Sequence, residues 1–580
     1  MSEKQLLSEE KPWLKFYGDI PKTVDYPKLS MYEAVMETVH EKPDYKAYDF
    51  MGREATYTEF AGQIDQCADA LWSIGLRKGD CITISMPTSP PGVIAFYAAN
   101  KLGAVASMIH PLSTESEIEF YVNVSKSKFV LTLDIFYDKM KAVQKKTQLE
   151  KLIIAKIQDW LPPHLSFLYW LKKGRMVEKV PASNTVIIMK DLMKKHYPKA
   201  PVVKVDTHDM AVILYSGGTT GKPKGIMLSN YNFISEGLMV ANWGGIDERY
   251  PNMLAVLPIF HGFGLGVCVN AILMAGGKCI MIPMFNPDEI GGIIKKKKPN
   301  YLIGPPTLYS ALARSKSFRQ TDLSCLRATF SGADTLPEKV KDEFENVVRQ
   351  NKGNTKLLEG YGLTEAVTAI MATPINDYRK GSIGLPFPDM LAKIVEMDTI
   401  NEIAPGQEGE ICVSGPAVMM GYLDNPEETA KVLKKHADGR TWLHTGDIGY
   451  MDKDGFFYFS LRKKRMIKSS GMNVYPAQVE EELYKHPLVK DACVIGVPDE
   501  KQVERVKAFV VLNDTDKAGA EMEKELISYC RKNIIKWSCP REVEFRADLP
   551  QTLVGKIAYK KLEDEEISRL KAEGKFAGKN

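Results

Sequence analysis

The chain has 580 residues, more than one hydrophobic core usually serves, so we expect a large body and at least one satellite domain. Its 77 Lys and Arg nearly balance its 73 Asp and Glu, and a formal net charge of +4 gives no electrostatic reason to expect a nucleic-acid partner. The 9 cysteines stand singly, without a nearby His to complete a zinc site, and the first residues are polar; we expect reduced thiols, no signal peptide and no membrane-spanning helix.

Short apolar runs alternate with helix-like stretches from about residue 32 to residue 282, for example at residues 81–85 and 211–215. This alternation predicts an α/β body. From residue 409 to residue 459 the apolar runs are separated by Gly and Asp turns, which predicts a small β-rich subdomain.

A polar basic link at residues 461–465 precedes a last segment with its own alternation. It predicts a helix over residues 477–485, strands over 492–497 and 506–512, and a helix over 521–531. We place a domain boundary at Lys464, so that residues 1–463 form an N-terminal body and residues 464–580 a small C-terminal α+β domain.

Two segments stand out from this pattern. The lysine run 295–298 lies before a proline and is typical of a solvated helix end, where lysines complement the helix dipole. Residues 160–175 place aromatic and leucine residues directly before a basic tail. This segment is either a helix buried on the body or an interfacial helix that touches a membrane surface.

A loop of glycine and hydroxyl residues, 215–225, directly follows an apolar strand. Such a loop leaves backbone N–H groups and Oγ atoms free to surround phosphate oxygens, while lysines neutralise charge. It is not a Walker P-loop, because Lys222 is followed by Pro223 rather than by Ser or Thr. The candidate phosphate ligands are Ser216, Gly217, Gly218, Thr219, Thr220, Gly221, Lys222 and Lys224.

The loop resembles the phosphate loop of the acyl-adenylate-forming (AMP-binding) superfamily, although many relatives have Ser at the position of Gly217. Four further blocks similar to those of the superfamily follow in order, at residues 331–337, 359–365, 442–449 and 549–557. The resemblance spans about residue 57 to residue 562, and the chain looks most like the bacterial fatty acyl-CoA synthetases. It implies an adenylation body of two α/β sheets plus the β-rich subdomain, and a mobile C-terminal domain.

The resemblance also implies roles for residues in the nucleotide site. Tyr361 would stack on adenine, Thr364 would contact phosphate, and Glu365 would hold Mg²⁺; a flat ring suits a purine and a carboxylate suits a hard cation. Asp447 would accept hydrogen bonds from both ribose hydroxyls, with Arg462 as a second ribose contact. The remaining residues implied to line the ATP or AMP site are Gly332, Ala333, Glu359 and Gly360.

Two half-reactions follow from the resemblance. A carboxylate attacks the α-phosphate of ATP and pyrophosphate leaves; then a thiol attacks the acyl-adenylate and AMP leaves. Lys556 would reach the active site during adenylation, and the C-terminal domain would then swing about a hinge at Lys464. The swing would bring the proposed coenzyme A loop toward the thiol tunnel; its residues are Lys468, Ser469, Ser470 and Gly471. The sequence departs from the superfamily pattern at Leu461 and Arg465.

The identity of the acid depends on the block at residues 257–264. His261 aligns with the Asp that pairs with the substrate ammonium in amino-acid-activating relatives, so an amino acid would lack a partner. We count His261 with Thr364, Glu365 and Lys556 among the catalytic candidates. The surroundings of His261 are apolar, and a hydrophobic acid fits best; its candidate apolar neighbours are Phe260, Phe263, Leu265, Val267 and Val269.

We therefore expect a cytoplasmic ligase that uses ATP, Mg²⁺ and coenzyme A to activate a medium- or long-chain fatty acid. Peripheral contact with the inner membrane face is the expectation that follows if residues 160–175 are interfacial. Three alternatives stay open: an acyl-AMP ligase that loads an acyl carrier protein, an aryl-acid CoA ligase, and a nucleotide-binding pseudoenzyme.

Overall fold

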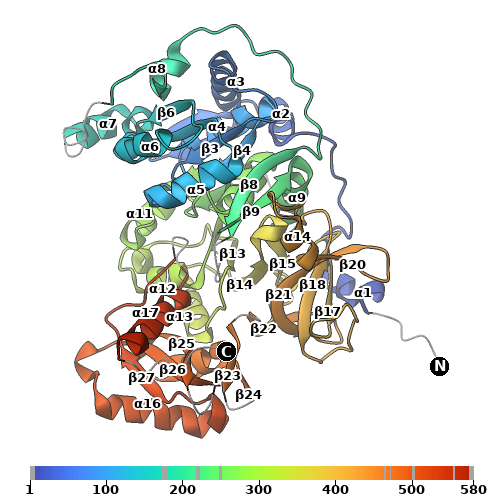
Figure 1. Ribbon diagram of the computed structural model, residues 1–580, viewed down its shortest axis with the longest axis vertical. Coiled ribbons are helices and arrows are strands. Elements are labelled where there is room, and N and C mark those ends of the chain that lie inside the picture. Colours follow the sequence, from blue (N-terminus) through green and yellow to red (C-terminus); the bar gives the residue numbers. More distant parts are fainter. Residues whose placement is uncertain are drawn as a thin grey trace.

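The computed structural model describes residues 7–171, 180–216, 223–246, 251–462, 465–469, 472–499, 503–552 and 556–573. Two large sheets form the body, a smaller β-rich unit lies beside them, and the C-terminal unit lies at the opposite end from helix α3 (Figure 1). The expected fold class is confirmed. The domain boundary between residues 463 and 464 stays a prediction.

The described residues form a nine-stranded sheet whose central strands are parallel. Antiparallel pairs close both edges, β14 with β15 and β1 with β2. In spatial order the strands are β16 (Leu385–Pro386), β15 (Ala369–Ala372), β14 (Leu357–Gly362), β13 (Ala328–Ser331), β12 (Tyr301–Gly304), β10 (Asn252–Ala255), β11 (Lys278–Met281), β1 (Lys46–Phe50) and β2 (Arg53–Thr56).

A second sheet of the described residues has eight strands, parallel from β8 to β7, with β9 and β19 added in antiparallel pairs. Its interior strands are buried on both faces, as is typical of parallel sheets covered by helices. In spatial order they are β19 (Gly421–Tyr422), β9 (Lys224–Ser229), β8 (Met210–Ser216), β4 (Val105–Met108), β3 (Cys81–Ser85), β5 (Phe129–Leu133), β6 (Lys151–Ala155) and β7 (Val186–Ile188).

Two smaller antiparallel or mixed sheets complete the described part of the chain. The β-rich unit contains β17 (Leu391–Val395), β18 (Gly409–Ser414), β21 (Thr441–Met451), β20 (Leu433–Lys435) and β22 (Phe457–Arg462). The C-terminal sheet contains β24 (Met472–Val474), β23 (Ile467–Ser469), β26 (Val503–Leu512), β25 (Val489–Asp499) and β27 (Glu542–Phe545).

Helices cover both large sheets, and several begin at a hydroxyl residue whose side chain and partner form a reciprocal cap. Ser30 with Glu33, Thr56 with Glu59, and Thr114 with Glu117 are such capping boxes, which satisfy backbone N–H groups that a helix start leaves unpaired. The helices of the body are α1 (Leu7–Glu10), α2 (Met31–Glu41), α3 (Tyr57–Ser73), α4 (Pro90–Lys101), α5 (Glu115–Ser125), α6 (Tyr137–Gln144), α7 (Pro163–Tyr169), α8 (Met189–Lys194), α9 (Asn230–Gly244), the π-helix η5 (Phe263–Ala271), α10 (Ile272–Met274), α11 (Pro287–Lys297), α12 (Pro306–Arg314), α13 (Glu338–Gln350) and α14 (Pro426–Val432).

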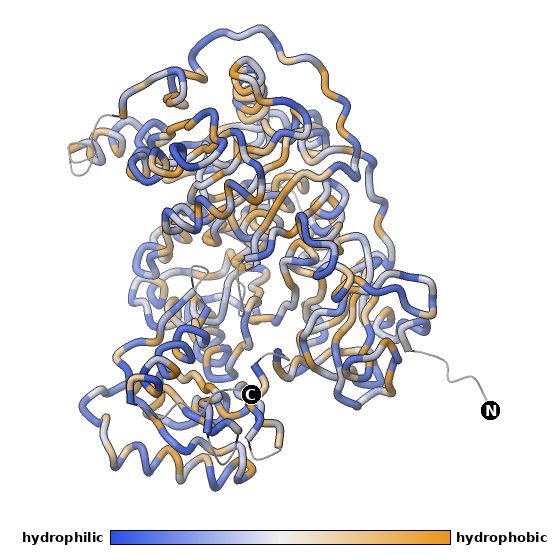
Figure 2. The backbone as a smooth tube through the Cα atoms, viewed as in Figure 1, coloured by the Kyte–Doolittle hydropathy of each residue, from blue (hydrophilic) through white to orange (hydrophobic). Residues whose placement is uncertain are grey.

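The C-terminal unit carries α15 (Pro476–Lys485), α16 (Ala520–Asn533) and α17 (Tyr559–Ala572). Its apolar residues form clusters of their own, separate from the extended core of the body. Figure 2 shows hydrophobic residues along the interior strands and alternating character on surface helices such as α16. The predicted strands at residues 81–85, 211–215, 492–497 and 506–512 and the predicted helices at 477–485 and 521–531 are all confirmed.

Two expectations need correction. The basic link was placed at residues 461–465, but Leu461 and Arg462 belong to strand β22, and Leu461 is buried. The lysine run is not wholly solvated, because Lys297 pairs with the buried carboxylate of Asp49. In the described part of the chain no helix has both the length and the apolar character needed to cross a bilayer.

Helix α7 lies within the aromatic segment 160–175. Some of the side chains of this segment pack against the core, and others are exposed at the surface. Leu165 and Tyr169 pack against the core of the body. Phe167 is 58% exposed and Trp170 is 44% exposed, with their rings stacked at 6.0 Å. Residues 172–175 lie outside the described residues.

Candidate active site

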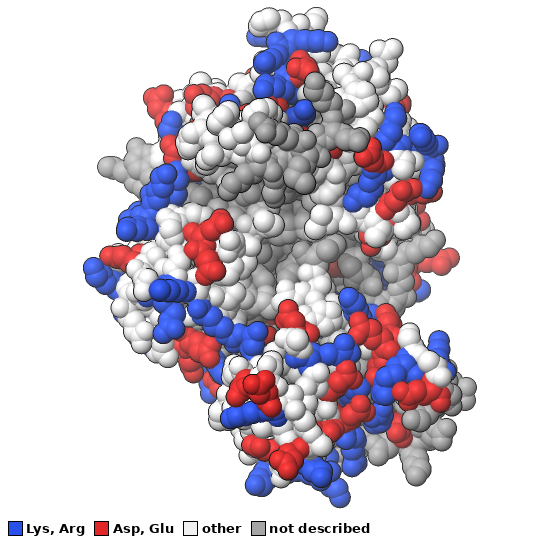
Figure 3. Space-filling view, turned by 90° about the vertical axis from the view of Figure 1, so that its left-hand side faces the viewer, with Lys and Arg blue, Asp and Glu red and all other residues white. Residues whose placement is uncertain are grey.

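A cavity of about 860 Å³ lies beyond the carboxyl ends of strands from both large sheets, where they face the C-terminal unit. Met108 at the end of β4, Ser216 at the end of β8 and Ser331 at the end of β13 line it. Ligands of open α/β sheets bind at such ends, because the loops that follow the strands converge there. On the face drawn in Figure 3, charges of both signs are interspersed over the C-terminal unit.

The residue expected to stack on adenine and one expected near the ribose converge on the carboxylate of Asp447. The Tyr361 hydroxyl donates to Asp447 Oδ2 at 2.8 Å, and Arg462 Nε lies 3.1 Å from Asp447 Oδ1. Asp447 and Arg462 are paired in register on β21 and β22, so the sheet itself holds them side by side. Burial raises the pKa of Asp447, and the Arg462 charge opposes that shift. A nucleotide ribose would meet a carboxylate that already accepts one hydrogen bond, from Tyr361, and forms an ion pair with Arg462.

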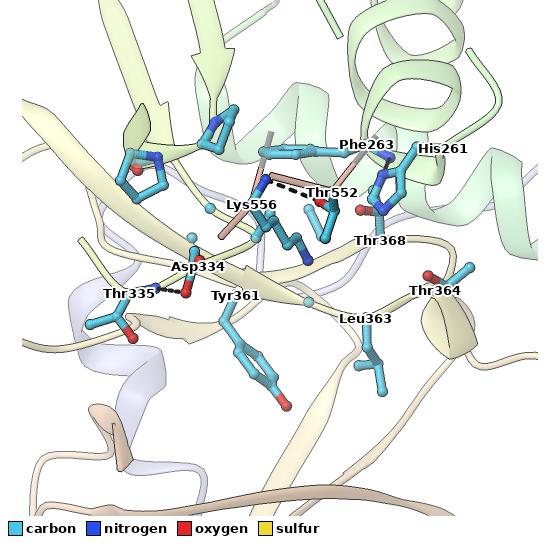
Figure 4. A pocket seen from close by; sticks show the side chains of 18 of the residues that line it. His261, Phe263, Asp334, Thr335, Tyr361, Leu363, Thr364, Thr368, Thr552 and Lys556 are labelled. Atoms are coloured by element: carbon cyan, nitrogen blue, oxygen red, sulfur yellow. Dashed lines mark hydrogen bonds between the residues drawn. The ribbon is translucent and has the colours of Figure 1, made fainter. Parts of the chain in front are cut away.

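Lys556 extends into the same cavity from the C-terminal unit (Figure 4). Its backbone N–H donates to Thr552 Oγ1 at 3.1 Å, and the neighbouring Ile557 pairs with Gln551, so the segment is anchored on both sides of the lysine. Burial and the Arg462 charge lower the pKa of Lys556, while Asp334 and Asp447 oppose that shift. The half-buried amine therefore interacts electrostatically with the carboxylate that is expected to bind ribose.

His261 lines the cavity across from Lys556 (Figure 4). Its Nδ1 accepts the Phe263 N–H at 3.1 Å, so the proton of the neutral ring lies on Nε2. Burial, with a smaller contribution from Lys556, lowers the pKa of His261 to about 3. The side chain is accordingly an uncharged donor at neutral pH.

Thr364 and Glu365 lie on the short helix η7 (Thr364–Ala366) and both line the cavity. Glu365 Oε1 accepts the Tyr422 hydroxyl at 2.9 Å, and in the described part of the chain no donor reaches Oε2. Mg²⁺ takes one or two carboxylates and completes its shell with water and phosphate, so a carboxylate on the wall of this cavity suits the ion. The residues present thus fit a magnesium ion.

The adenine and acyl block lies at the carboxyl ends of β13 and β14. Gly332, Ala333, Glu359 and Gly360 all line the cavity. A Cβ atom on Gly332 would lie 3.1 Å from the Gly360 carbonyl oxygen, and Ala333 has a φ of 74°. Burial raises the pKa of Glu359 to about 8.

The structure does not bring every predicted residue to the cavity. Lys224 pairs with Glu428, and its ammonium lies 4.7 Å from the centre of the Tyr422 ring rather than on the cavity wall. Lys468 and Ser469 lie on β23, away from the lining, and the Lys468 N–H donates to Glu504. Other predicted residues lie outside the described ones: Gly217, Gly218, Thr219, Thr220, Gly221, Lys222, Lys464, Ser470 and Gly471.

One end of the cavity is apolar. Of the five predicted apolar neighbours of His261, Phe260, Phe263 and Val267 line it, whereas Leu265 and Val269 are buried in the core. The rest of this wall could not be predicted from the sequence, since an apolar stripe on a helix or strand is typical of a buried core. These missed residues include Val240, Trp243, Ile303, Phe330, Met371 and Phe387.

Another site was missed in the β-rich unit. Cys412, expected to stand without a nearby His, pairs with His444 across β18 and β21, and both lie close to Glu410. The three side chains are buried. His444 lies inside a block that the sequence analysis selected, but its neighbours come from strands that only the fold brings together.

Comparison with known proteins gives one consistent result. A family model described as AMP-binding enzyme matches residues 35–423, and one described as AMP-binding enzyme C-terminal domain matches residues 478–556. The chain is 37% identical over 566 residues to a long-chain-fatty-acid–CoA ligase of Bacillus subtilis (strain 168), covering 97% of this chain and 99% of that one. It is 33% identical to a protein of the same name from Salmonella typhimurium, over 96% of this chain and 98% of that one. The crystal structure of ATP-bound MatB from Rhodopseudomonas palustris has a TM-score of 0.81 and 25% identity, covering 93% of this chain and 99% of that chain.

Proposed function

The chain belongs to the family of AMP-binding enzymes, and from this premise we propose that it joins a medium- or long-chain fatty acid to coenzyme A, using ATP. In the first step a carboxylate oxygen of the acid attacks the α-phosphorus of ATP, and pyrophosphate leaves. In the second step the coenzyme A sulfur attacks the acyl-adenylate carbonyl, and AMP leaves with the electron pair of the broken C–O bond.

One observation supports this function above the others. A single cavity joins a group of charged side chains, among them Lys556, Arg462 and Asp447, to an apolar end lined by residues such as Trp243 and Ile303. The charged end suits the phosphates and ribose of a nucleotide, and the apolar end suits a hydrocarbon chain. An α-amino acid would place its ammonium near the uncharged His261, without a carboxylate partner there.

The side chains divide the work of the first step. The attacking acid is already ionised at neutral pH, so no general base is needed. Negative charge grows on the phosphoryl oxygens, and the Lys556 ammonium and the Thr364 hydroxyl line the cavity where that charge forms. The neutral His261 would donate a hydrogen bond from Nε2 to an oxygen of the substrate, and the ring carries no positive charge of its own.

The same cavity can position the rest of the nucleotide. Asp447, held by Tyr361 and Arg462, would accept the ribose hydroxyls, and the ring of Tyr361 would pack on adenine. Glu365 would hold Mg²⁺, which supplies further neutralisation of phosphate charge when bound.

We also propose a location: the cytoplasm, with the α7 face against an anionic membrane surface. The exposed aromatic pair Phe167 and Trp170 supports this, together with the basic residues that follow in the sequence. Apolar insertion and basic attraction add in such interfacial segments. A fatty acid partitions into membranes, so this contact would place the enzyme near its substrate.

The function is tested with purified protein, ATP, Mg²⁺ and a panel of acids. Pyrophosphate release should rise with chain length among saturated fatty acids, from short to medium or long, and should be low with benzoate and with amino acids. With coenzyme A added, mass spectrometry should find the fatty acyl thioester. Comparable rates with amino acids would contradict the substrate class, and pyrophosphate release without any thioester would favour a carrier protein as acceptor. Absence of pyrophosphate release with every acid would identify a pseudoenzyme.

A further inference from the structure

Asp447 lies in a bulge of strand β21. Along β18, Glu410 pairs with Ile448 and Cys412 pairs with His444, so the single residue Ile411 faces three residues, 445–447, of β21. A bulge re-aims side chains and leaves backbone groups outside the regular ladder. Gly446 has a φ of 72°, a conformation that disfavours any side chain.

The freed groups of the bulge are held by two side chains. Glu410 Oε1 accepts the Gly446 N–H at 2.9 Å. The Thr445 hydroxyl donates to the Ile411 carbonyl oxygen at 2.7 Å and accepts the Asp447 N–H at 3.1 Å. The two backbone N–H groups that precede the Asp447 Cα, those of Gly446 and Asp447, are therefore both held, and among the described residues Glu410 holds its N–H from a side chain outside the bulge.

A chain of two imidazoles continues from Glu410. Its Oε2 lies 2.9 Å from His444 Nδ1, and His444 Nε2 lies 3.0 Å from His436 Nε2. The carboxylate can only accept, so His444 carries a proton on Nδ1 and donates it to Glu410. All three residues are buried, and burial lowers the pKa of His436 to about 4, which keeps that ring neutral. Hydrogen bonds thus connect His436 through His444 to Glu410 and hold the carboxylate in place.

The chain also ties the bulge to a hairpin. His436 lies at the turn between β20 and β21, where its carbonyl oxygen accepts the Gly439 N–H at 3.0 Å. The same turn is anchored by Asp438, which accepts the indole N–H of the fully buried Trp442 at 2.9 Å. Glu410 is therefore held, through the two imidazoles, by a hydrogen-bonded turn of the protein rather than by solvent.

We propose that Glu410, His444 and His436 are positioning residues for the ribose of ATP, because they hold the 445–447 bulge that presents Asp447 to the cavity. This inference rests on the proposed function, since it assigns a support to the residue proposed to bind ribose. Charged hydrogen bonds are sensitive to small displacements, so a loosened bulge would weaken the contacts of Asp447 with both ribose hydroxyls. Glu410, His444 and His436 do not themselves line the cavity, so they would act only through Asp447.

A metal ion among Glu410, Cys412 and His444 is the competing account of this cluster. The hydrogen bonds argue against it, because Glu410 already accepts from Gly446 and His444 through different oxygens. Lys393 also faces Cys412 in register from the next strand, and its ammonium would oppose a cation there.

The test compares ATP with 2′-deoxy-ATP in the full-length enzyme. Glu410→Ala should raise KM for ATP about tenfold and reduce the preference for ATP over 2′-deoxy-ATP about tenfold, the loss expected for one charged hydrogen bond. The KM for the fatty acid should not change. Glu410→Gln should restore most of the preference, because its amide oxygen can still accept the Gly446 N–H. If Glu410→Ala does not fold, His444→Leu should give the same direction of change with a smaller size.

Two further variants make the result decisive. Cys412→Ala removes buried volume beside the bulge without removing any of the hydrogen bonds that hold it, so it should lower the melting temperature while keeping the preference for ATP. Asp447→Asn should abolish the preference. If Asp447→Asn keeps the preference for ATP, the proposed ribose site itself is wrong. If Asp447→Asn loses the preference but Glu410→Ala keeps it, only the positioning role of Glu410 is wrong. Stoichiometric metal in the purified protein that disappears in Cys412→Ala would also overturn that role.

Discussion

Glu236 is a buried carboxyl group with one weak partner. It lies on α9, where its Oε1 accepts the Ala369 N–H at 3.4 Å, and Oε2 has no partner among the described residues. Burial raises its pKa to about 8. An unpaired buried carboxylate is costly, so the group is protonated in the folded protein near neutral pH.

This protonation predicts a pH-dependent stability. The pKa of a glutamate in the unfolded chain is about 4.3, so the folded protein holds the extra proton between about pH 4.3 and pH 8. The free energy of unfolding therefore falls as pH rises through this window, by about 1 kcal/mol per pH unit. Glu236→Gln removes that loss, and its melting temperature relative to the wild type should increase from pH 5 to pH 8. Glu41→Gln, on an exposed site, should show a constant difference, and a constant difference for Glu236→Gln would contradict the assignment.

The predicted residues that meet in the cavity are those carried by short blocks of contiguous sequence. Tyr361, Asp447, Arg462 and Lys556 could be selected because glycine, hydroxyl and charged residues stand together in an order that resembles a known superfamily. Trp243 could not, because an apolar residue in an apolar helix has the same pattern whether it faces a core or a cavity. The roles assigned to Tyr361, Asp447, Arg462 and Lys556 stay predictions.

At the scale of elements, local patterns identified the strands and helices that are strongly apolar or strongly periodic, but not the contacts between them. The lysine run at the end of α11 illustrates the difference. Lys297 reaches Asp49 on β1, whose side chain is 1% exposed and whose Oδ1 also accepts the Gly52 N–H at 3.0 Å. The sequence separation is too large for a local pattern to reveal this pair.

The pair between α11 and β1 predicts strong coupling. Lys297→Met leaves a buried carboxylate without its counter-ion and should lower the free energy of unfolding by about 3 kcal/mol. Adding Asp49→Asn should recover part of this loss, because the uncompensated charge is gone. Chemical denaturation of the two single variants and the double variant measures the coupling, and strictly additive losses would show that the pair does not act as a unit.

Helix α7 gives the second prediction at this scale. Replacing Phe167 and Trp170 together by serine should weaken binding to anionic vesicles at least tenfold, and binding of the wild type should fall as salt is raised. Met284→Ser, at an apolar residue that is 78% exposed elsewhere on the body, is the matched control and should bind like the wild type. Sedimentation with vesicles measures the binding. Wild-type protein that stays in the supernatant would contradict the membrane contact.

At the scale of the whole molecule, the two sides of the expected hinge are fixed to different units. Arg462 belongs to β22 and lies against Asp447 of the body. Arg465 pairs with Glu480 on α15 of the C-terminal unit. Any rotation of one unit against the other would therefore concentrate at residues 463–464, which is where the sequence analysis placed the boundary.

Lys556 reaches the cavity from the C-terminal unit, so the described arrangement fits the adenylating pose. The later approach of Lys468 and Ser469 would require the other pose, since these residues lie away from the cavity here. No local pattern could predict the arrangement of the units, because it depends on contacts between segments about a hundred residues apart.

The account is tested most directly by measuring the two half-reactions separately in two variants. Lys556→Ala should lower acyl-AMP formation by a factor of about 10²–10³, the loss typical of a removed charge donor, while thioester formation from supplied acyl-AMP survives. Lys464→Pro fixes φ at the hinge and restricts the preceding residue, so adenylation should persist while thioester formation fails. If both variants stay folded by circular dichroism and lose both half-reactions equally, the alternation of the C-terminal domain and the role of Lys556 are contradicted.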